Sequence, residues 1–440
     1  MNQSKLDWAH AWLGGVADKP SDDARFIEQL KQELPVLPFL GLPFAEDMIA
    51  KLEEYEPFLR GFKHMLLLGI GGSALGPRAL QRAFAPAQDR PGCDGPCLWI
   101  ADNVDPDWLQ DHLDKLVPED TVVVVISKSG GTIETMTQYL IVLPWLQKKL
   151  PDSWKDHLFM VTDTVKGPLR AEADKYGIRS LPVPDYLGGR YSVLSAVGMV
   201  PAVFMGMDWK GLLRGAMSVG RPLAQNPEAL LDHPAWKLAR WAYQMSEAGK
   251  SQVIYFCYIP SWSTFGPWFC QLWAESLGKD GKGTQPIPAT GVTDQHSLLQ
   301  MFLDGPKDKI CLFVSSPADK SILPIPHDVP EQWKYLSGQT FGDVLEAETI
   351  ATRATLAEKD VPTVHLDMAD SSAESVGKMM MLLEAATIFT GWLMGINPLD
   401  QPAVELGKRL ANTRLGASGY PREAADLAEY LAVAQEPESF

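Results

Sequence analysis

Short apolar runs rich in Val, Ile and Leu recur along the chain, and each ends near Gly, Ser or Asp. Longer segments with the helical spacing of apolar residues separate these runs. The alternation predicts buried strands of parallel sheets, because helices cover both faces of such sheets and leave no polar side. The first set of predicted strands covers 65–69, 97–101, 121–127 and 158–162, and the second covers 252–259, 309–315 and 363–367.

Two α/β units in tandem follow from the two sets of strands. We place the first unit at 40–210 and the second at 235–440. A helical lead over 1–39 precedes them, and the Pro/Gly-bearing stretch 211–234 forms the crossover.

An apolar run at 379–396 is almost long enough to cross a bilayer. Lys378 precedes it and Glu384 interrupts it, and such charges are costly in a membrane. We therefore predict a buried helix between packed layers.

Composition narrows the classes of function. The 440 residues carry a net charge of −16, and 46% of them are hydrophobic, which indicates a folded, acidic chain. An acidic surface without a basic tract repels phosphate backbones and anionic lipid, so we expect no nucleic-acid and no membrane partner. A small anionic ligand would need a local cluster of Lys or Arg.

Five cysteines form an odd and sparse set, at positions 93, 97, 257, 270 and 311. This number favours a reducing compartment over a disulfide-bonded secreted scaffold, so we expect a cytoplasmic protein. The first residues also lack the basic-then-apolar build of a signal peptide. Cys93 and Cys97 have no second Cys or His pair nearby, and we expect no metal site there.

Ligands of parallel sheets bind beyond the carboxyl ends of the strands, where loops lead into helix N-termini. The first such loop reads Gly-Ile-Gly-Gly-Ser-Ala-Leu-Gly-Pro at 69–77. It also satisfies the dinucleotide fingerprint G-x-G-x-x-A, so a nicotinamide or flavin enzyme is a competing interpretation. The acidic partner of that fingerprint is expected about 20 residues on, and the strand-end candidate, Asp102, lies farther away.

A second loop, Ser-Lys-Ser-Gly-Gly-Thr-Ile-Glu-Thr at 127–135, follows the third predicted strand. Hydroxyls, a lysine, backbone amides and a helix dipole converge there, which suits a bound phosphate. The alternative is a simple helix start with Ser127 or Ser129 as the N-cap.

Two further segments offer a cation and a base. Arg190 follows a diglycine in Gly-Gly-Arg-Tyr-Ser (188–192) and precedes an apolar helix, which favours an inward guanidinium that holds a developing oxyanion. Glu275 lies in the last turn of an aromatic helix ended by Gly278, a setting that suits a general base. An ion pair of Glu275 with Lys279 is the structural alternative.

The remaining candidates are a histidine and a helix near the C-terminus. His296 lies at the start of a helical segment, where the dipole favours a neutral imidazole. Gln401 and Lys408 are seven residues apart, so one helical face carries both, with Glu405 beside Lys408. An exposed Glu–Lys pair is the alternative.

Taken together, these segments resemble the glucose-6-phosphate isomerase (phosphoglucose isomerase) family in its bacterial short form. Six motifs occur in the family's order: the loop at 69–77, the loop at 127–135, Gly-Gly-Arg-Tyr-Ser at 188–192, Glu-Ser-x-Gly-Lys at 275–279, Gln-His-Ser at 295–297 and Asp-Gln-x-x-Val-Glu-x-x-Lys at 400–408.

The resemblance implies two sugar-isomerase (SIS) domains, each a flavodoxin-like α/β/α sandwich with a mostly parallel sheet. It implies reversible isomerisation of glucose 6-phosphate and fructose 6-phosphate, a step of glycolysis and gluconeogenesis, through ring opening and a cis-enediol. It also implies a homodimer and no metal or coenzyme.

The resemblance further implies that Glu275 moves a proton between C1 and C2 and that Arg190 stabilises the enediolate. His296, contributed by the partner subunit, and Lys408 are implied to assist ring opening. The residues implied to bind the substrate are Gly72, Ser73, Ser127, Lys128, Ser129, Thr132 and Gln401.

Three positions depart from the family's pattern: Gly131 stands where Thr is usual, Leu399 replaces an aromatic residue and Ala403 a glycine. None of them removes a proposed catalytic group. Two alternatives stay open, a non-catalytic SIS-type sugar-phosphate sensor and a dual phosphoglucose/phosphomannose isomerase.

Overall fold

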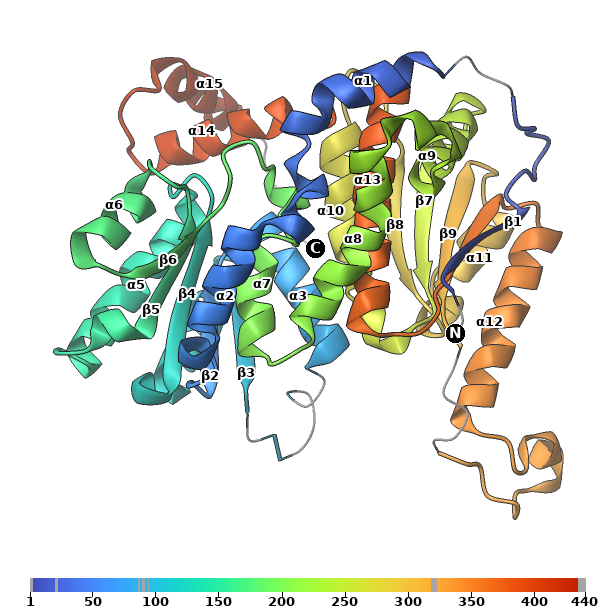
Figure 1. Cartoon of the computed structure of the whole chain (residues 1–440), viewed down its shortest axis with the longest axis horizontal. Coiled ribbons are helices and arrows are strands. Elements are labelled where there is room, and N and C mark those ends of the chain that lie inside the picture. The colour runs from blue at the N-terminus through green and yellow to red at the C-terminus, as the bar shows by residue number, and fades with distance from the viewer. Residues whose placement is uncertain are drawn as a thin grey trace. The chain divides into compact units, whose positions relative to one another are not determined.

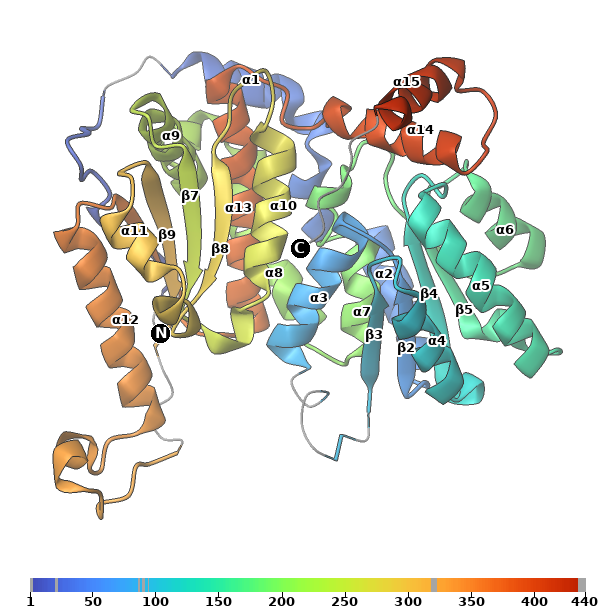
Figure 2. The same cartoon turned by 180° about the vertical axis from the view of Figure 1, so that it is seen from behind.

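The computed structural model describes residues 3–19, 23–85, 88, 92–93, 95–317 and 323–433. It divides into two compact units, Met1–Pro398 and Leu399–Phe440. The first unit contains both sheets (Figures 1 and 2). The second contains α14 (Glu405–Arg414) and α15 (Pro421–Ala432), which pack together. This division does not test the domain boundaries predicted at 210 and 235, which lie inside the first unit and stay a prediction.

The first sheet has five parallel strands in the order β3-β2-β4-β5-β6. They are β2 (His64–Leu68), β3 (Cys97–Ala101), β4 (Thr121–Ser127), β5 (Leu158–Thr162) and β6 (Arg179–Pro182). The four predicted strands are confirmed to within one residue, and β6 was not predicted. The order is the flavodoxin-like 2-1-3-4-5, in which ligands bind where β2 and β4 diverge.

The helices of the first half lie on both faces of this sheet (Figure 1). They are α2 (Glu46–Leu59), α3 (Gly72–Phe84), α4 (Pro106–Lys115), α5 (Ile133–Lys149), α6 (Pro168–Tyr176) and α7 (Ala196–Phe204).

The second sheet has the order β1-β10-β9-β7-β8. Four strands are parallel, namely β7 (Gln252–Cys257), β8 (Gln285–Thr290), β9 (Lys309–Ser315) and β10 (Thr363–Asp367), and they repeat the 2-1-3-4 order of the first sheet. The fifth, β1 (Lys5–His10), comes from the start of the chain and pairs antiparallel with β10. The segment 1–39 is therefore not purely helical as predicted, because β1 completes the sheet edge before α1 (Arg25–Glu33) begins.

The helices of the second half surround this sheet (Figure 2). They are α8 (Trp209–Gln225), α9 (Pro234–Glu247), α10 (Phe265–Leu277), α11 (Leu299–Asp304), α12 (Phe341–Glu358) and α13 (Ala373–Met394). The predicted crossover at 211–234 is mostly helical, since α8 and a 3-10 turn at Pro227–Asp232 fill it.

Helix α13 confirms the buried helix predicted for the apolar run. It is long and apolar enough to cross a membrane, but 83% of the relevant window is buried inside the protein, against α8, α9 and α10. Glu384 is fully buried in it, and neither carboxyl oxygen has a hydrogen-bond partner among the described residues. Burial raises the pKa of Glu384 well above its ordinary value of 4.5.

Glu384 should therefore make stability depend on pH. The folded chain keeps a proton that the unfolded chain releases near the ordinary pKa of Glu, so the free energy of unfolding should fall as the pH rises from there to the raised pKa. The Glu384→Gln variant has no such proton. Relative to wild type it should gain up to about 1.4 kcal/mol per pH unit across this range.

Denaturant unfolding of both proteins between pH 5 and pH 8 measures this difference. Glu374→Gln is the matched control, because Glu374 lies on the same helix in an exposed ion pair with Lys378. Parallel pH profiles for wild type and Glu384→Gln would contradict the prediction.

Candidate active site

The loop after β2 enters α3 through glycines that permit close packing. Gly71 has φ of 57°, and a Cβ at Gly72 would lie 2.2 Å from the carbonyl oxygen of Gly189. Only glycine fits at such a distance, so the start of α3 lies directly against the segment that carries Arg190. Helices α3 and α10 also pack together between the two sheets (Figures 1 and 2).

The dinucleotide interpretation finds no support in this loop. Gly72 is accounted for by the approach of the Gly189 backbone, and Gly76 by the approach of the Val193 side chain. Asp102, the proposed acidic partner, accepts a 2.8 Å hydrogen bond from Arg78 Nε.

The loop after β4 gathers the hydroxyls that were predicted to bind phosphate. Ser127 Oγ and Thr132 Oγ1 are 3.0 Å apart, and the Gly131 N–H donates to Ser129 Oγ at 3.2 Å. The N-cap of α5 is Thr132, and its side chain makes no capping bond. The alternative with Ser127 or Ser129 as N-cap is therefore wrong. Since β2 and β4 are neighbours in register, this loop lies beside the 69–72 loop.

Lys128 is the cation of this loop. Its side chain is half-buried, and this desolvation lowers its pKa, while Asp185 and Asp163 oppose the shift. A partly desolvated ammonium binds an anion more strongly than a fully hydrated one does.

Arg190 is buried as predicted, with 2% of its surface exposed, in a 3-10 turn at Gly189–Tyr191. Its guanidinium joins distant parts of the chain. Nε donates to Ser276 Oγ at 2.7 Å, Nη2 donates to the Pro398 carbonyl at 2.6 Å, and Nη1 lies 3.3 Å from Glu275 Oε2. Arg190 therefore joins the end of α10, through Glu275 and Ser276, to Pro398 at the end of the first compact unit.

Glu275 lies in the last turn of α10, and Gly278 is the C-cap, as predicted. One carboxyl oxygen faces Arg190, and the other accepts a 3.0 Å hydrogen bond from Gln271 Nε2. Its side chain is 33% exposed, so solvent and a ligand can reach it. Lys279 Nζ donates to the carbonyl oxygens of Ser276 and Asn397.

Three residues of this site were missed in the sequence. Gln271 is one helical turn before Glu275, and a polar side chain at i−4 on the same helical face was the available signal. Ser276 and Tyr191 share a 2.7 Å hydrogen bond. Both lie inside the motifs at 275–279 and 188–192, but the sequence gives no sign that these two motifs meet. Burial raises the pKa of Tyr191 to about 12, so its hydroxyl stays protonated.

The other predicted site residues are not brought to Glu275 within the first unit. His296 ends a 3-10 turn, Thr293–His296, and its side chain is exposed. Gln401 and Lys408 belong to the second compact unit. There α14 begins only at Glu405, after a 3-10 turn, so the prediction of one continuous helical face for Gln401 and Lys408 is wrong.

Within the second unit, Lys408 Nζ lies 2.6 Å from Glu405 Oε1, and both side chains are exposed. This is the exposed pair that the alternative interpretation predicted.

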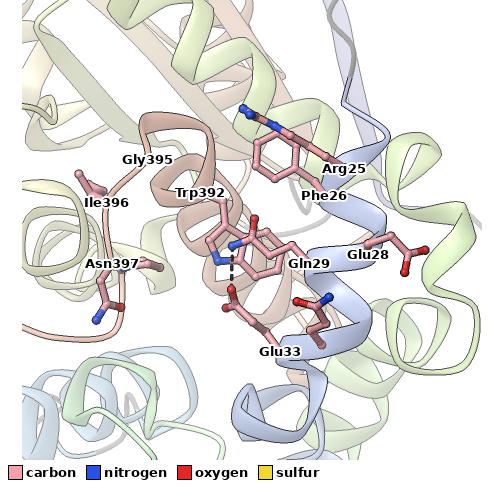
Figure 3. Close-up of a pocket in the computed structure, with 11 residues that line it drawn as sticks. Arg25, Phe26, Glu28, Gln29, Glu33, Trp392, Gly395, Ile396 and Asn397 are labelled. Atoms are coloured by element: carbon pink, nitrogen blue, oxygen red, sulfur yellow. Dashed lines mark hydrogen bonds between the residues drawn. The ribbon is translucent and has the colours of Figure 1, made fainter.

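A pocket of about 740 Å³ lies elsewhere, between α1 and the end of α13 (Figure 3). Trp392 and Asn397 line it opposite Gln29, which donates to Glu33. None of the motif residues lines this pocket, although Pro398 connects it to Arg190. In the described parts of the chain, no group of three or more His, Cys, Asp or Glu side chains could hold a metal ion.

Comparison with known families decides the relationship. Residues 58–315 match the model of the phosphoglucose isomerase family. The chain belongs to this family. A glucose-6-phosphate isomerase from Rubrobacter xylanophilus is 40% identical over 391 residues, which are 87% of this chain and 90% of that protein. A second, from Carboxydothermus hydrogenoformans, is 35% identical and covers 96% of this chain and 95% of its own.

Solved structures agree with the fold. A hypothetical protein from Thermus thermophilus has a TM-score of 0.83 at 32% identity, over 94% of this chain and 100% of that one. A glucose-6-phosphate isomerase from Chlamydia trachomatis has a TM-score of 0.70 at 23% identity, over 97% and 81% of the two chains. The predicted fold class, α/β with two mostly parallel sheets of the phosphosugar-isomerase type, is confirmed.

Proposed function

We propose that this chain interconverts glucose 6-phosphate and fructose 6-phosphate, as its relatives are named for doing. The observation that carries the proposal is the pairing of Glu275 with the buried guanidinium of Arg190. Proton transfer beside a carbonyl needs a carboxylate base and a cation for the enediolate oxygen, and this pair supplies both. Arg190 Nη1 and Glu275 Oε2 are 3.3 Å apart, which supports a shared role for the two groups.

The phosphate is held by the loop after β4. Lys128 supplies the charge, and Ser127, Ser129 and Thr132 supply hydroxyls. Gly72 and Ser73, at the start of α3, are next to the sugar hydroxyls. This arrangement uses the binding energy of the remote phosphate to position C1 and C2 at Glu275.

The complete site also needs residues that lie outside this core. His296 is proposed to come from the partner subunit of a homodimer, where its exposed side chain assists ring opening. Lys408 is proposed to assist ring opening as well, and Gln401 to contact the substrate. A cytoplasmic location is proposed as well, and the five free cysteines agree with a reducing compartment.

An isomerase assay in the presence of EDTA tests the proposal. Purified protein should convert fructose 6-phosphate to glucose 6-phosphate without added metal, with product detected by a coupled dehydrogenase. Saturable binding of either sugar phosphate without turnover would instead indicate the non-catalytic sensor. The same assay with mannose 6-phosphate tests the dual-specificity alternative.

The phosphate loop yields a separate prediction. Lys128→Ala should raise the KM for fructose 6-phosphate about 10- to 100-fold, because a hydrogen bond to a charged group contributes about 1.5–3 kcal/mol. The kcat should fall as well, because the phosphate contacts also position C1 and C2 at Glu275. Lys166→Ala is the control, because Lys166 is an exposed neighbour that pairs with Asp185. An unchanged KM for Lys128→Ala would place the phosphate elsewhere.

A further inference from the structure

His296 lies in an exposed turn that side-chain hydrogen bonds hold in place. The turn Thr293–His296 follows β8, and Asp294 in the turn bonds to a residue on each side of it. Asp294 Oδ2 accepts from the Thr290 N–H at 2.7 Å, and Oδ1 accepts from Ser297 Oγ at 2.5 Å. The imidazole itself has no hydrogen-bond partner in the part of the chain that the structure describes.

The residue before His296 points the other way. Gln295 Nε2 donates to Tyr258 Oη at 2.7 Å and to Thr352 Oγ1 at 2.9 Å, and the Tyr258 hydroxyl donates to Thr352 Oγ1 at 2.7 Å. We call these three residues the Gln295 network. They come from three separate places in the chain: the 3-10 turn, the residue directly after β7 and the middle of α12.

Two members of the Gln295 network are buried and closely packed. Tyr258 and Thr352 are 2% and 3% exposed. The Tyr258 ring stacks on Phe313 at 4.8 Å between centroids, and a Cβ at Gly291 would come within 2.5 Å of the ring. Burial raises the pKa of Tyr258, so its hydroxyl remains a donor. The amide nitrogen of Gln295 is thus hydrogen-bonded to two buried hydroxyl groups, which restrain the direction of its side chain.

We infer that the Gln295 network positions His296 for the active site of the partner subunit, so that Tyr258 and Thr352 act on catalysis in a subunit other than their own. The inference rests on the proposed function, in which His296 acts across a homodimer. The inward amide of Gln295 and the outward imidazole of His296 are consecutive side chains of one turn. A displacement of about 1 Å at a catalytic group is enough to slow a reaction strongly.

The first test is a double-mutant cycle. Tyr258→Phe removes one hydroxyl and keeps the stacked ring, and it should lower kcat about tenfold while KM changes less than about twofold. In the His296→Ala background the same substitution should have no further effect, because the group that it positions is gone. Tyr139→Phe is the matched control: its hydroxyl bonds to Glu172 on α6, and its effect should be small in both backgrounds.

The second test assigns the effect to a subunit. One chain carries Glu275→Gln and the other His296→Ala, and differently tagged copies are coexpressed so that mixed dimers can be isolated. A mixed dimer has one intact site, which combines Glu275 of the second chain with His296 of the first. It should therefore be active although each parent homodimer is impaired.

Tyr258→Phe is then added to one chain at a time. In the chain that provides His296 it should reduce the activity of the mixed dimer about tenfold, and in the other chain it should have no effect. Equal losses in both placements, or additive losses in the cycle, would overturn the inference while leaving the isomerase proposal intact. Failure of the mixed dimer to recover activity would overturn the transfer of His296 and the inference with it.

Thr352→Val and Gln295→Leu repeat both tests. The first removes the hydroxyl of Thr352 and the second the amide of Gln295 from the Gln295 network. Thermal unfolding of each variant identifies any that do not fold, and the remaining variants carry the comparison.

Discussion

Replacing Glu275 with Gln should lower kcat for both directions of the isomerisation by about 10²- to 10⁴-fold, which is the usual contribution of a general base. The amide keeps the shape of the side chain and still has an oxygen for Gln271. The KM should stay within a few-fold of the wild-type value, because the phosphate loop after β4 is untouched. Steady-state kinetics with fructose 6-phosphate measure both parameters.

A second readout makes the Glu275→Gln result specific to proton transfer. Wild-type protein in D₂O should place deuterium at C2 of the glucose 6-phosphate product, and the variant should lose this exchange together with turnover. Glu374→Gln, on an exposed surface of α13, should behave as wild type. Turnover within tenfold of wild type for Glu275→Gln would assign the base to another residue.

Replacing Arg190 with Met should affect both activity and folding. Removal of this buried cation takes one donor from the Pro398 carbonyl and one from Ser276, although both still bond to Tyr191. It also leaves Glu275 without its counter-charge. The Glu275 side chain is 33% exposed, so water can solvate its carboxylate, and the loss of the donors to Ser276 and Pro398 should cost about 1–3 kcal/mol of stability. The kcat should fall by about 10²- to 10³-fold, as is usual when one donor to a developing oxyanion is removed.

Two further variants separate these effects of Arg190. Arg190→Lys keeps the charge but not the three-way geometry, so it should recover part of the stability and little of the activity. Arg78→Met is the matched control, because Arg78 also bonds a carboxylate and a carbonyl but is 39% exposed. Its loss should cost less than about 1 kcal/mol. Equal losses in the free energy of unfolding for Arg190→Met and Arg78→Met would contradict the stabilising role of the Arg190 contacts.

The strands that the sequence predicts well are those with uninterrupted apolar runs. Strand β4 is fully buried and was predicted with its bounds, because a strand covered on both faces must be apolar throughout. Strand β8, Gln-Pro-Ile-Pro-Ala-Thr, was missed because its two prolines argue against a strand. It is an edge strand, where a missing N–H is tolerated. Strand β1 was missed because its partner is at the far end of the chain.

The sequence predicts many individual residues of the candidate site, but it does not predict which of them contact one another. The loops after β2 and β4 are local signals, since glycine and hydroxyl residues at strand ends have a limited number of uses. The contact of Arg190 with Ser276 and Pro398 joins segments that no spacing rule connects. The position of Gln271 was within reach, because it shares a helical face with Glu275.

The antiparallel edge strand β1 has a consequence for synthesis on the ribosome. Its residues leave the exit tunnel early, whereas β10, the strand that it pairs with, is translated much later. The sheet of β2–β6 can form from its own contiguous segment before β10 is made, and during this time β1 has no strand to pair with. A nascent chain that loses β1 would expose the free edge of β10, and unpaired edges of this kind recruit other chains.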